Sequence, residues 1–325
     1  MPMIDNFGWA ARRQLTKAVQ NADQAEMAAL IESVVSTTVG VLDERIAEAF
    51  EDDIDDAVED PLRAQVDRDF QLEELMGETL EEIERRIHWL GDMYPFSLEG
   101  NTLKYSASTT GVYEYCLAIS QAPSITAHPY VELVRYFEVL AADSVRAFLG
   151  DDADFLRTGA PTIEHPKSSA GFEDGMRRLN ASTGEWVWHP QPEALPDLEH
   201  VKDEGLDFVV WKRLDERSGA LFVVGQCACG DTDWHEKDQD IDSALVRIRR
   251  WLSRLSFVPP IRAFAVPFPI SATAVFSSLT DRAGLTLDRL RLTRIAENAN
   301  HRDYFSHTHG AALGRMTQIV LEAKR

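Results

Sequence analysis

Apolar residues recur every three or four positions through much of the first half of the chain. This spacing predicts a helical region over 8–50 and, after the acidic break at 51–61, a second helix over 62–92. Alternating apolar residues on either side of a Gly-Asn pair predict a small hairpin over 94–106. A long helix is expected from about 129 to 149, because a proline stands at its start and a glycine follows its end.

The apolar pattern changes in the second half, where short continuous apolar runs alternate with helical spacing. We expect a short helix, three strands, an amphipathic helix and a fourth strand, at residues 169–180, 185–189, 206–212, 220–228, 238–255 and 261–268. This order predicts an α/β sheet covered by helices.

The segment 150–161, with the sequence GDDADFLRTGAP, is the expected domain boundary because it combines acids, glycine and proline. A chain of 325 residues is long enough for two hydrophobic cores. We therefore predict a mainly helical N-terminal domain over 1–155 and an α/β domain over 156–325.

Charge is distributed unevenly along the chain, whose net charge is −21. Residues 1–100 hold 24 acidic and 8 basic residues, a net charge of −16, whereas 251–325 hold 5 acidic and 10 basic residues, a net charge of +5. The acidic balance opposes nonspecific binding to nucleic acid, although a local basic surface can still bind it. The acidic N-terminal domain is interpreted either as solvated helix faces or as a regulatory surface that docks a protein partner or a second copy.

Other sequence features narrow the cellular setting. No apolar run reaches the roughly 18 residues of a membrane span, and the N-terminal residues lack the apolar core of a signal peptide. Cys116, Cys227 and Cys229 are not spaced like a disulfide framework or a zinc site, so we interpret them as reduced thiols. These features predict a cytoplasmic protein with no membrane partner.

Three polar residues in the second half suggest a metal site. Asp207 opens one predicted strand, Gln226 stands toward the end of the next, and Glu173 lies on the preceding helix. If the two strands pair through the turn at 215–219, Asp207 and Gln226 come out near the same end of the sheet. Their hard oxygen atoms would suit Mg²⁺ or Mn²⁺, which can activate water to cut a phosphodiester.

The segments GFEDGMRRL (171–179), DEGLDFVVWK (203–212) and VVGQCACG (223–230) together resemble the PD-(D/E)XK nucleases, and within them the Mrr-like restriction endonucleases. The resemblance covers about a third of the chain. It implies a restriction-endonuclease-like α/β fold and a metal-dependent DNA endonuclease that serves in bacterial defence. It also implies that Glu173, Asp207 and Gln226 hold the metal.

The chain departs from the family pattern at Ala228, where the family has a lysine that orients the attacking water. Lys237, just past the strand, is the expected substitute, while Lys212 points away from Asp207 by strand alternation. The alternative is a degenerate nuclease fold that serves as a DNA-binding or protein-interaction subunit. In a purely structural interpretation, Gln226 caps a strand and Asp207 begins one at a turn.

Arginines are concentrated near the C-terminal end of the chain. We expect Arg250, Arg254, Arg289 and Arg291 to form a groove that tracks DNA phosphates; the competing interpretation pairs them with the acidic domain. The histidine-rich segment 301–310 is interpreted as a polar loop with helix capping. The chain has no nucleophile elbow, phosphate-binding glycine loop or dinucleotide fingerprint.

Overall fold

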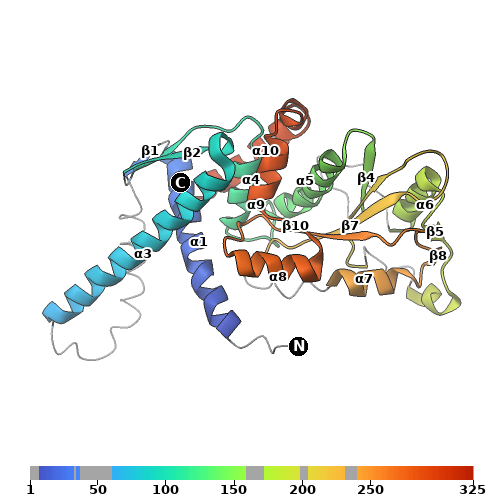
Figure 1. The fold of residues 1–325 in the computed structure, drawn as a ribbon, viewed down its shortest axis with the longest axis horizontal. Coiled ribbons are helices and arrows are strands. Elements are labelled where there is room, and N and C mark those ends of the chain that lie inside the picture. The colour runs from blue at the N-terminus through green and yellow to red at the C-terminus, as the bar shows by residue number, and fades with distance from the viewer. Residues whose placement is uncertain are drawn as a thin grey trace. The chain divides into compact units, whose positions relative to one another are not determined.

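The chain folds as two compact units (Figure 1). A computed structural model describes residues 7–32, 34–36, 61–100, 102–158, 172–197, 204–230 and 240–324. One unit comprises the described residues up to Ser108 with Ser271–Val275, and the other comprises Thr109–Ile270 with Phe276–Lys324. The expected boundary at 155/156 is corrected, because it falls inside strand β4 (Ala153–Arg157), which pairs with a strand of the second unit.

The first unit packs two long helices against a small antiparallel sheet of order β1-β3-β2. Its elements are α1 (Phe7–Glu32), β1 (Val34–Ser36), α3 (Pro61–Leu90), the short 3-10 helix η1 (Gly91–Met93), β2 (Phe96–Glu99) and β3 (Thr102–Tyr105). The hairpin predicted over 94–106 is confirmed as β2 and β3. The first predicted helix is too long, because β-branched Val34 and Val35 leave it and pair with β3 as a strand.

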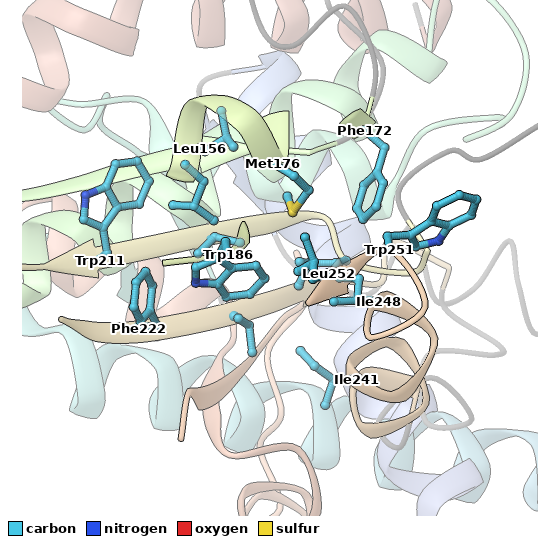
Figure 2. Close-up of a cluster of buried hydrophobic side chains, with 14 of the residues drawn as sticks. Leu156, Phe172, Met176, Trp186, Trp211, Phe222, Ile241, Ile248, Trp251 and Leu252 are labelled. Atoms are coloured by element: carbon cyan, nitrogen blue, oxygen red, sulfur yellow. The ribbon is translucent and has the colours of Figure 1, made fainter. Parts of the chain in front are cut away.

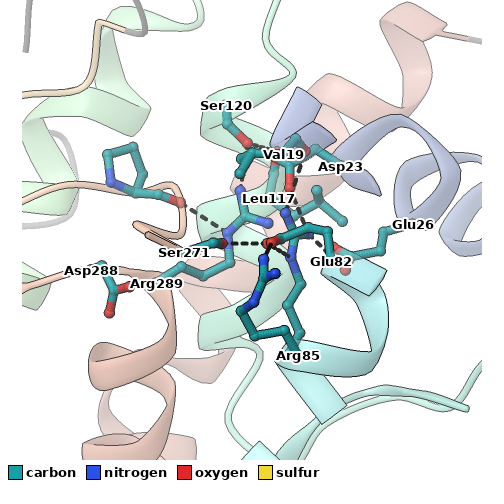
Figure 3. A network of polar contacts seen from close by, with 12 residues as sticks. Val19, Asp23, Glu26, Glu82, Arg85, Leu117, Ser120, Ser271, Asp288 and Arg289 are labelled. Atoms are coloured by element: carbon teal, nitrogen blue, oxygen red, sulfur yellow. Dashed lines mark hydrogen bonds and ion pairs between the residues drawn. The ribbon is translucent and has the colours of Figure 1, made fainter. Parts of the chain in front are cut away.

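Part of the acidic charge of this unit lies inside it. The fully buried guanidinium of Arg86 contacts the carboxylates of Asp23 at 2.8 Å, Glu26 at 2.7 Å and Glu82 at 2.8 Å. Figure 3 shows Glu82 bound also by Ser271, whose hydroxyl donates at 2.6 Å. Removing one member of such a buried ion pair costs about 3–5 kcal/mol. These acids therefore stabilise the packing of α1 on α3, so the interpretation as solvated helix faces does not apply to them.

The second unit is built on a five-stranded mixed sheet of order β10-β9-β7-β6-β4. Neighbours are antiparallel from β4 to β7 and parallel from β7 to β10. The remaining strands are β6 (Phe208–Lys212), β7 (Leu221–Cys227), β9 (Ile261–Ala265) and β10 (Leu285–Leu287). A mixed α/β architecture is thereby confirmed for this part of the chain.

Helices cover both faces of this sheet. On one face a core cluster joins α6 (Phe172–Thr183) and α7 (Asp240–Ile248) to the strands through Met176, Trp211, Phe222 and Ile248 (Figure 2). The opposite face carries α5 (Val131–Leu149), where Glu138 binds Arg157 of β4 at 2.5 Å. The other helices are α4 (Val112–Ser120), η2 (Pro192–Asp197), α8 (Thr273–Ala283), α9 (Arg289–Ala296) and α10 (Arg302–Lys324).

Two predicted elements differ from the structure. The predicted strand 185–189 does not join the main sheet; it forms β5 (Val187–Trp188), which pairs with β8 (Leu252–Arg254) as a separate two-stranded ribbon. The predicted helix 238–255 ends at Ile248, and its last part supplies β8 instead. The third antiparallel strand of the main sheet is therefore β4, which lies before α6 in the chain.

A buried polar cluster joins α5 to α10, where the sequence suggested a loop. His309 Nε2 lies 2.8 Å from Asp143 Oδ2, and its Nδ1 lies 2.8 Å from the Tyr136 hydroxyl. Asp143 also accepts hydrogen bonds from Arg146 and from Tyr304. The histidine is thus a core residue of the helical layer. Separately, none of the described helices is both long and apolar enough to cross a membrane.

Candidate functional site

Asp207 and Gln226 meet at one edge of the main sheet. The antiparallel register pairs Phe208 with Gly225, and the Asp207 N–H donates to the Gly225 carbonyl at 3.0 Å. Asp207 therefore lies just before β6, next to the end of β7 that carries Gln226. By strand alternation the Gln226 side chain lies on the face of the sheet that carries α6 and α7, as that of Val224 does. The prediction that these two residues share one end of the sheet is confirmed.

A glycine fixes this register. The ring of Phe208 lies over Gly225 on the opposite face of the sheet, so that a Cβ at Gly225 would meet the ring at 1.9 Å. No side chain larger than hydrogen fits there without moving β6 or β7. The polar residue Gln226 therefore follows a position where the two strands are held in close contact.

The side-chain oxygen of Gln226 is buried without a hydrogen-bond partner among the described residues. The whole residue is only 8% exposed. A buried acceptor without a donor costs about 1–3 kcal/mol, so such an atom points to a ligand that would satisfy it. Amide and carboxylate oxygens are ligands that Mg²⁺ accepts, and the Asp207 carboxylate stands on the neighbouring strand.

Asp207 also has a structural role. Its Oδ2 accepts a hydrogen bond from the backbone N–H of Cys227 at 2.7 Å, which ties the start of β6 to the end of β7. Burial raises the pKa of the Cys227 thiol, and the negative charges of Asp207 and Glu138 raise it further. Cys227 is therefore held as a neutral thiol, consistent with its interpretation as a small packing residue.

Glu173 stands apart from this pair in its recorded contacts. It lies in the first turn of α6, where Arg177 of the same helix binds its carboxylate at 2.6 Å. The described part of the chain contains no group of three or more His, Cys, Asp or Glu side chains placed to hold a metal. The structure thus pairs Asp207 with Gln226 and leaves Glu173 in a surface ion pair.

Three positions bear on the lysine that the family resemblance implies. Ala228 is buried, and its N–H donates to the Ala265 carbonyl at 2.9 Å, so this position continues the parallel ladder. Lys212 binds Asp152 and the Leu149 carbonyl, each at 2.7 Å, at the end of α5 on the opposite face of the sheet. Lys237 lies outside the described residues.

The four predicted DNA-binding arginines do not form one surface. Arg289 is fully buried: it donates to the Pro267 carbonyl at 2.9 Å and to the Ser120 hydroxyl at 2.7 Å (Figure 3). Its assignment to a DNA groove is therefore wrong. The other three are exposed or partly exposed, and each lies over an aromatic ring. The contacts are Arg291 with Phe276, Arg250 with Trp251 and Arg254 with Phe257.

A strained turn leads into Asp207. Glu204 and Gly205 both have positive φ, at 56° and 80°, and the former is costly for a residue with a side chain. The turn is held by Arg247, which donates to the Glu204 carbonyl at 2.8 Å, and by Trp251, whose indole donates to the Glu204 carboxylate at 2.8 Å. Gly205 is the one sequence signal for this turn; its two clamping residues are more than forty positions away.

At this end of the sheet the described residues offer a buried amide oxygen on β7, a carboxylate just before β6, a fixed strand register and a clamped turn, but no assembled catalytic set. Comparison of the chain with protein-family models, with curated proteins and with solved structures returned no match.

Proposed function

We propose that the chain is a metal-dependent DNA endonuclease whose cation is held at the edge formed by Asp207 and Gln226. The observation that carries the proposal is the buried Gln226 oxygen, which has no donor among the described residues and lies beside a carboxylate-bearing strand. A divalent cation would satisfy that oxygen and the neighbouring negative charge together.

Each residue would have a distinct role. Asp207 would supply the charged ligand, kept in place by the Cys227 N–H, and Gln226 the neutral one. Bound Mg²⁺ or Mn²⁺ would lower the pKa of a water molecule and neutralise charge on the phosphate under attack. Glu173 as a third ligand and Lys237 as the water-orienting group rest on the family resemblance alone.

The first test measures the thermal unfolding midpoint with and without Mg²⁺ or Mn²⁺. A cation at 100 times its Kd stabilises the folded state by about 2.7 kcal/mol, so the wild type should melt higher with metal. Asp207→Asn keeps an acceptor for the strand but loses the charge, and Gln226→Leu removes the buried oxygen; both should lose the metal response. Asp154→Asn, on an exposed residue of β4, is the matched control and should keep it.

The second test is nicking of supercoiled plasmid. Cleavage by the wild type that disappears in both Asp207→Asn and Lys237→Ala would support the endonuclease and the displaced lysine. A metal response that survives Asp207→Asn and Gln226→Leu would contradict the site.

A second function is favoured by Ala228. The position where the resemblance requires a lysine holds a buried alanine that is part of the β7–β9 ladder. A nuclease fold without that amine would bind DNA or a protein without cutting. Metal binding without plasmid cleavage at any cation concentration would favour this interaction subunit over the enzyme.

A further inference from the structure

One segment of the chain is free of acidic residues. Acids make up 54 of the 325 residues, yet the stretch 243–280 contains none and carries five arginines. The part of this stretch between 249 and 257 forms β8 and its flanks. Here the local charge is opposite to that of the protein as a whole.

This part pairs with β5 in a short antiparallel ribbon, which we call the β5–β8 ribbon (186–191 with 250–255). Val187 pairs with Arg254 and Trp188 with Leu252. Backbone hydrogen bonds extend the pairing, as the Gln191 N–H donates to the Arg250 carbonyl at 2.8 Å. The ribbon is therefore a short hydrogen-bonded element, with a register shift between Val187 and Trp188.

The segment 249–257, which contains β8, carries both buried and exposed residues. Trp251 and Leu252 belong to the buried core cluster (Figure 2). Arg249 and Arg254 are exposed, and neither has a carboxylate partner among the described residues. The Arg254 guanidinium lies 4.6 Å from the ring centre of Phe257, which is itself 55% exposed. An arginine resting on an aromatic ring keeps its N–H donors for a further anion.

The two ends of the ribbon contact opposite ends of the β6–β7 hairpin. At one end, Trp251 donates to Glu204 in the turn that leads into Asp207. At the other, the buried carboxylate of Glu185 binds the Phe257 N–H at 2.6 Å and the N–H groups of the β6–β7 turn. The segment 251–257 thus runs between the turn that leads into Asp207 and the β6–β7 turn.

We propose that the exposed residues Arg249, Arg254 and Phe257, on and beside the β5–β8 ribbon, bind the phosphate backbone of duplex DNA and lead it toward the Asp207–Gln226 edge. Only the direction of the DNA toward Asp207 and Gln226 rests on the proposed function; the binding of DNA by these exposed residues is argued independently of it. In a chain of net charge −21, exposed arginines that have no carboxylate partner among the described residues complement a polyanion. The exposed ring of Phe257 adds an apolar contact of the kind found beside sugar and base edges.

The test is equilibrium binding of a fluorescent duplex by the full chain in EDTA, across a range of salt concentrations. The double variant Arg249→Gln/Arg254→Gln should bind about 10 to 100 times more weakly, with a salt slope smaller by nearly 2, since each phosphate contact contributes about 0.9. The control double variant Arg302→Gln/Arg315→Gln makes the same charge change on exposed positions of α10 and should bind as the wild type.

Three results would overturn the proposal. They are no duplex binding by the wild type, equal loss in both double variants, or competition by polyglutamate as strong as competition by unlabelled duplex, which would indicate an acidic protein partner. Because Arg249 and Arg254 are exposed, the unfolding midpoint should not change; Arg249→Glu alone repeats the test if the double variant fails to fold.

The binding assay contains no metal, so it separates the two proposals. Duplex binding through the ribbon without plasmid cleavage would refute the endonuclease and keep the ribbon. Cleavage by a double variant that still binds as the wild type would refute the ribbon and keep the endonuclease.

Discussion

Replacing Glu185 by glutamine should destabilise the second unit without changing its volume. Glu185 is fully buried, and its Oε1 accepts N–H groups from Gly219 at 2.9 Å and Ala220 at 3.0 Å. Its Oε2 accepts the N–H of Phe257 at 2.6 Å. One carboxylate therefore holds the β6–β7 turn to the end of the β5–β8 ribbon.

The expected cost follows from these three bonds. In the glutamine variant, the amide oxygen still accepts from the β6–β7 turn, but its NH₂ group faces the Phe257 N–H. A buried donor left without an acceptor costs about 1–3 kcal/mol, and the two remaining bonds lose the charge that makes such bonds worth about 1.5–3 kcal/mol each. Relief from burying a charge offsets part of this loss. We expect a net destabilisation of about 2–4 kcal/mol.

Urea unfolding followed by tryptophan fluorescence measures this change, because four of the described tryptophans lie in the second unit: Trp186, Trp188, Trp211 and Trp251. With a slope of about 1–3 kcal/mol per molar urea, the midpoint should fall by roughly 1 M or more. Glu216→Gln is the control, since its side chain is 96% exposed in a surface pair with Arg213 and should cost under about 0.5 kcal/mol. A Glu185→Gln midpoint equal to the control would refute the reasoning.

Two further changes test the packing. Gly225→Ala should prevent stable folding, since the added Cβ would meet the Phe208 ring. Gly77→Ala, in open space on helix α3, should instead raise the melting temperature by the equivalent of about 0.5–1 kcal/mol. Equal shifts of the melting temperature in the two variants would contradict both predictions. Burial alone would raise the pKa of Asp143, but hydrogen bonds from His309 and a neighbouring arginine hold it below its usual value. The stability that the charged Asp143 adds is complete above the unfolded pKa of about 3.9 and is lost as pH falls through the folded pKa. The difference in unfolding free energy between wild type and Asp143→Asn should therefore be largest near neutral pH and shrink in acid. A difference that stays constant with pH would disprove the account.

The meeting of Asp207 and Gln226 was predictable because it depends on local sequence. A short polar turn joins two apolar runs, and a hairpin of that kind fixes which residues face each other. The helices at 61–90 and 131–149 were predictable for a similar reason, since their apolar spacing is long and regular.

Strand β4 was not predictable, because its pairing is not local. Two of its five residues, Asp154 and Arg157, are charged, and turn-forming residues flank it on both sides. The sequence therefore resembles a domain boundary. Its partner β6 begins about fifty positions later, after α6 and the β5 segment. For the same reason, β5 was assigned to the wrong sheet: two residues cannot specify which neighbour they pair with.

Arg289 shows that charge along a sequence does not reveal exposure. It follows the N-cap Asp288 and precedes other arginines, which is typical of a solvated helix start. Its burial comes from the Pro267 carbonyl, the Ser120 hydroxyl and the Tyr113 ring, all distant in sequence. An arginine so enclosed cannot reach a phosphate, whereas Arg254 and Arg291 are exposed.

The case for a metal rests on Gln226 more than on Asp207. The bond from the Cys227 N–H gives Asp207 a sufficient structural reason to be present, with or without a cation. No donor among the described residues bonds the Gln226 oxygen, and an apolar residue like Val224, two positions earlier on the same face, would fill the space without burying such an oxygen. Gln226→Leu should therefore stabilise the metal-free protein and abolish its response to Mg²⁺. If the variant is stabilised and still responds, the cation binds elsewhere, and the sheet edge is a structural feature only.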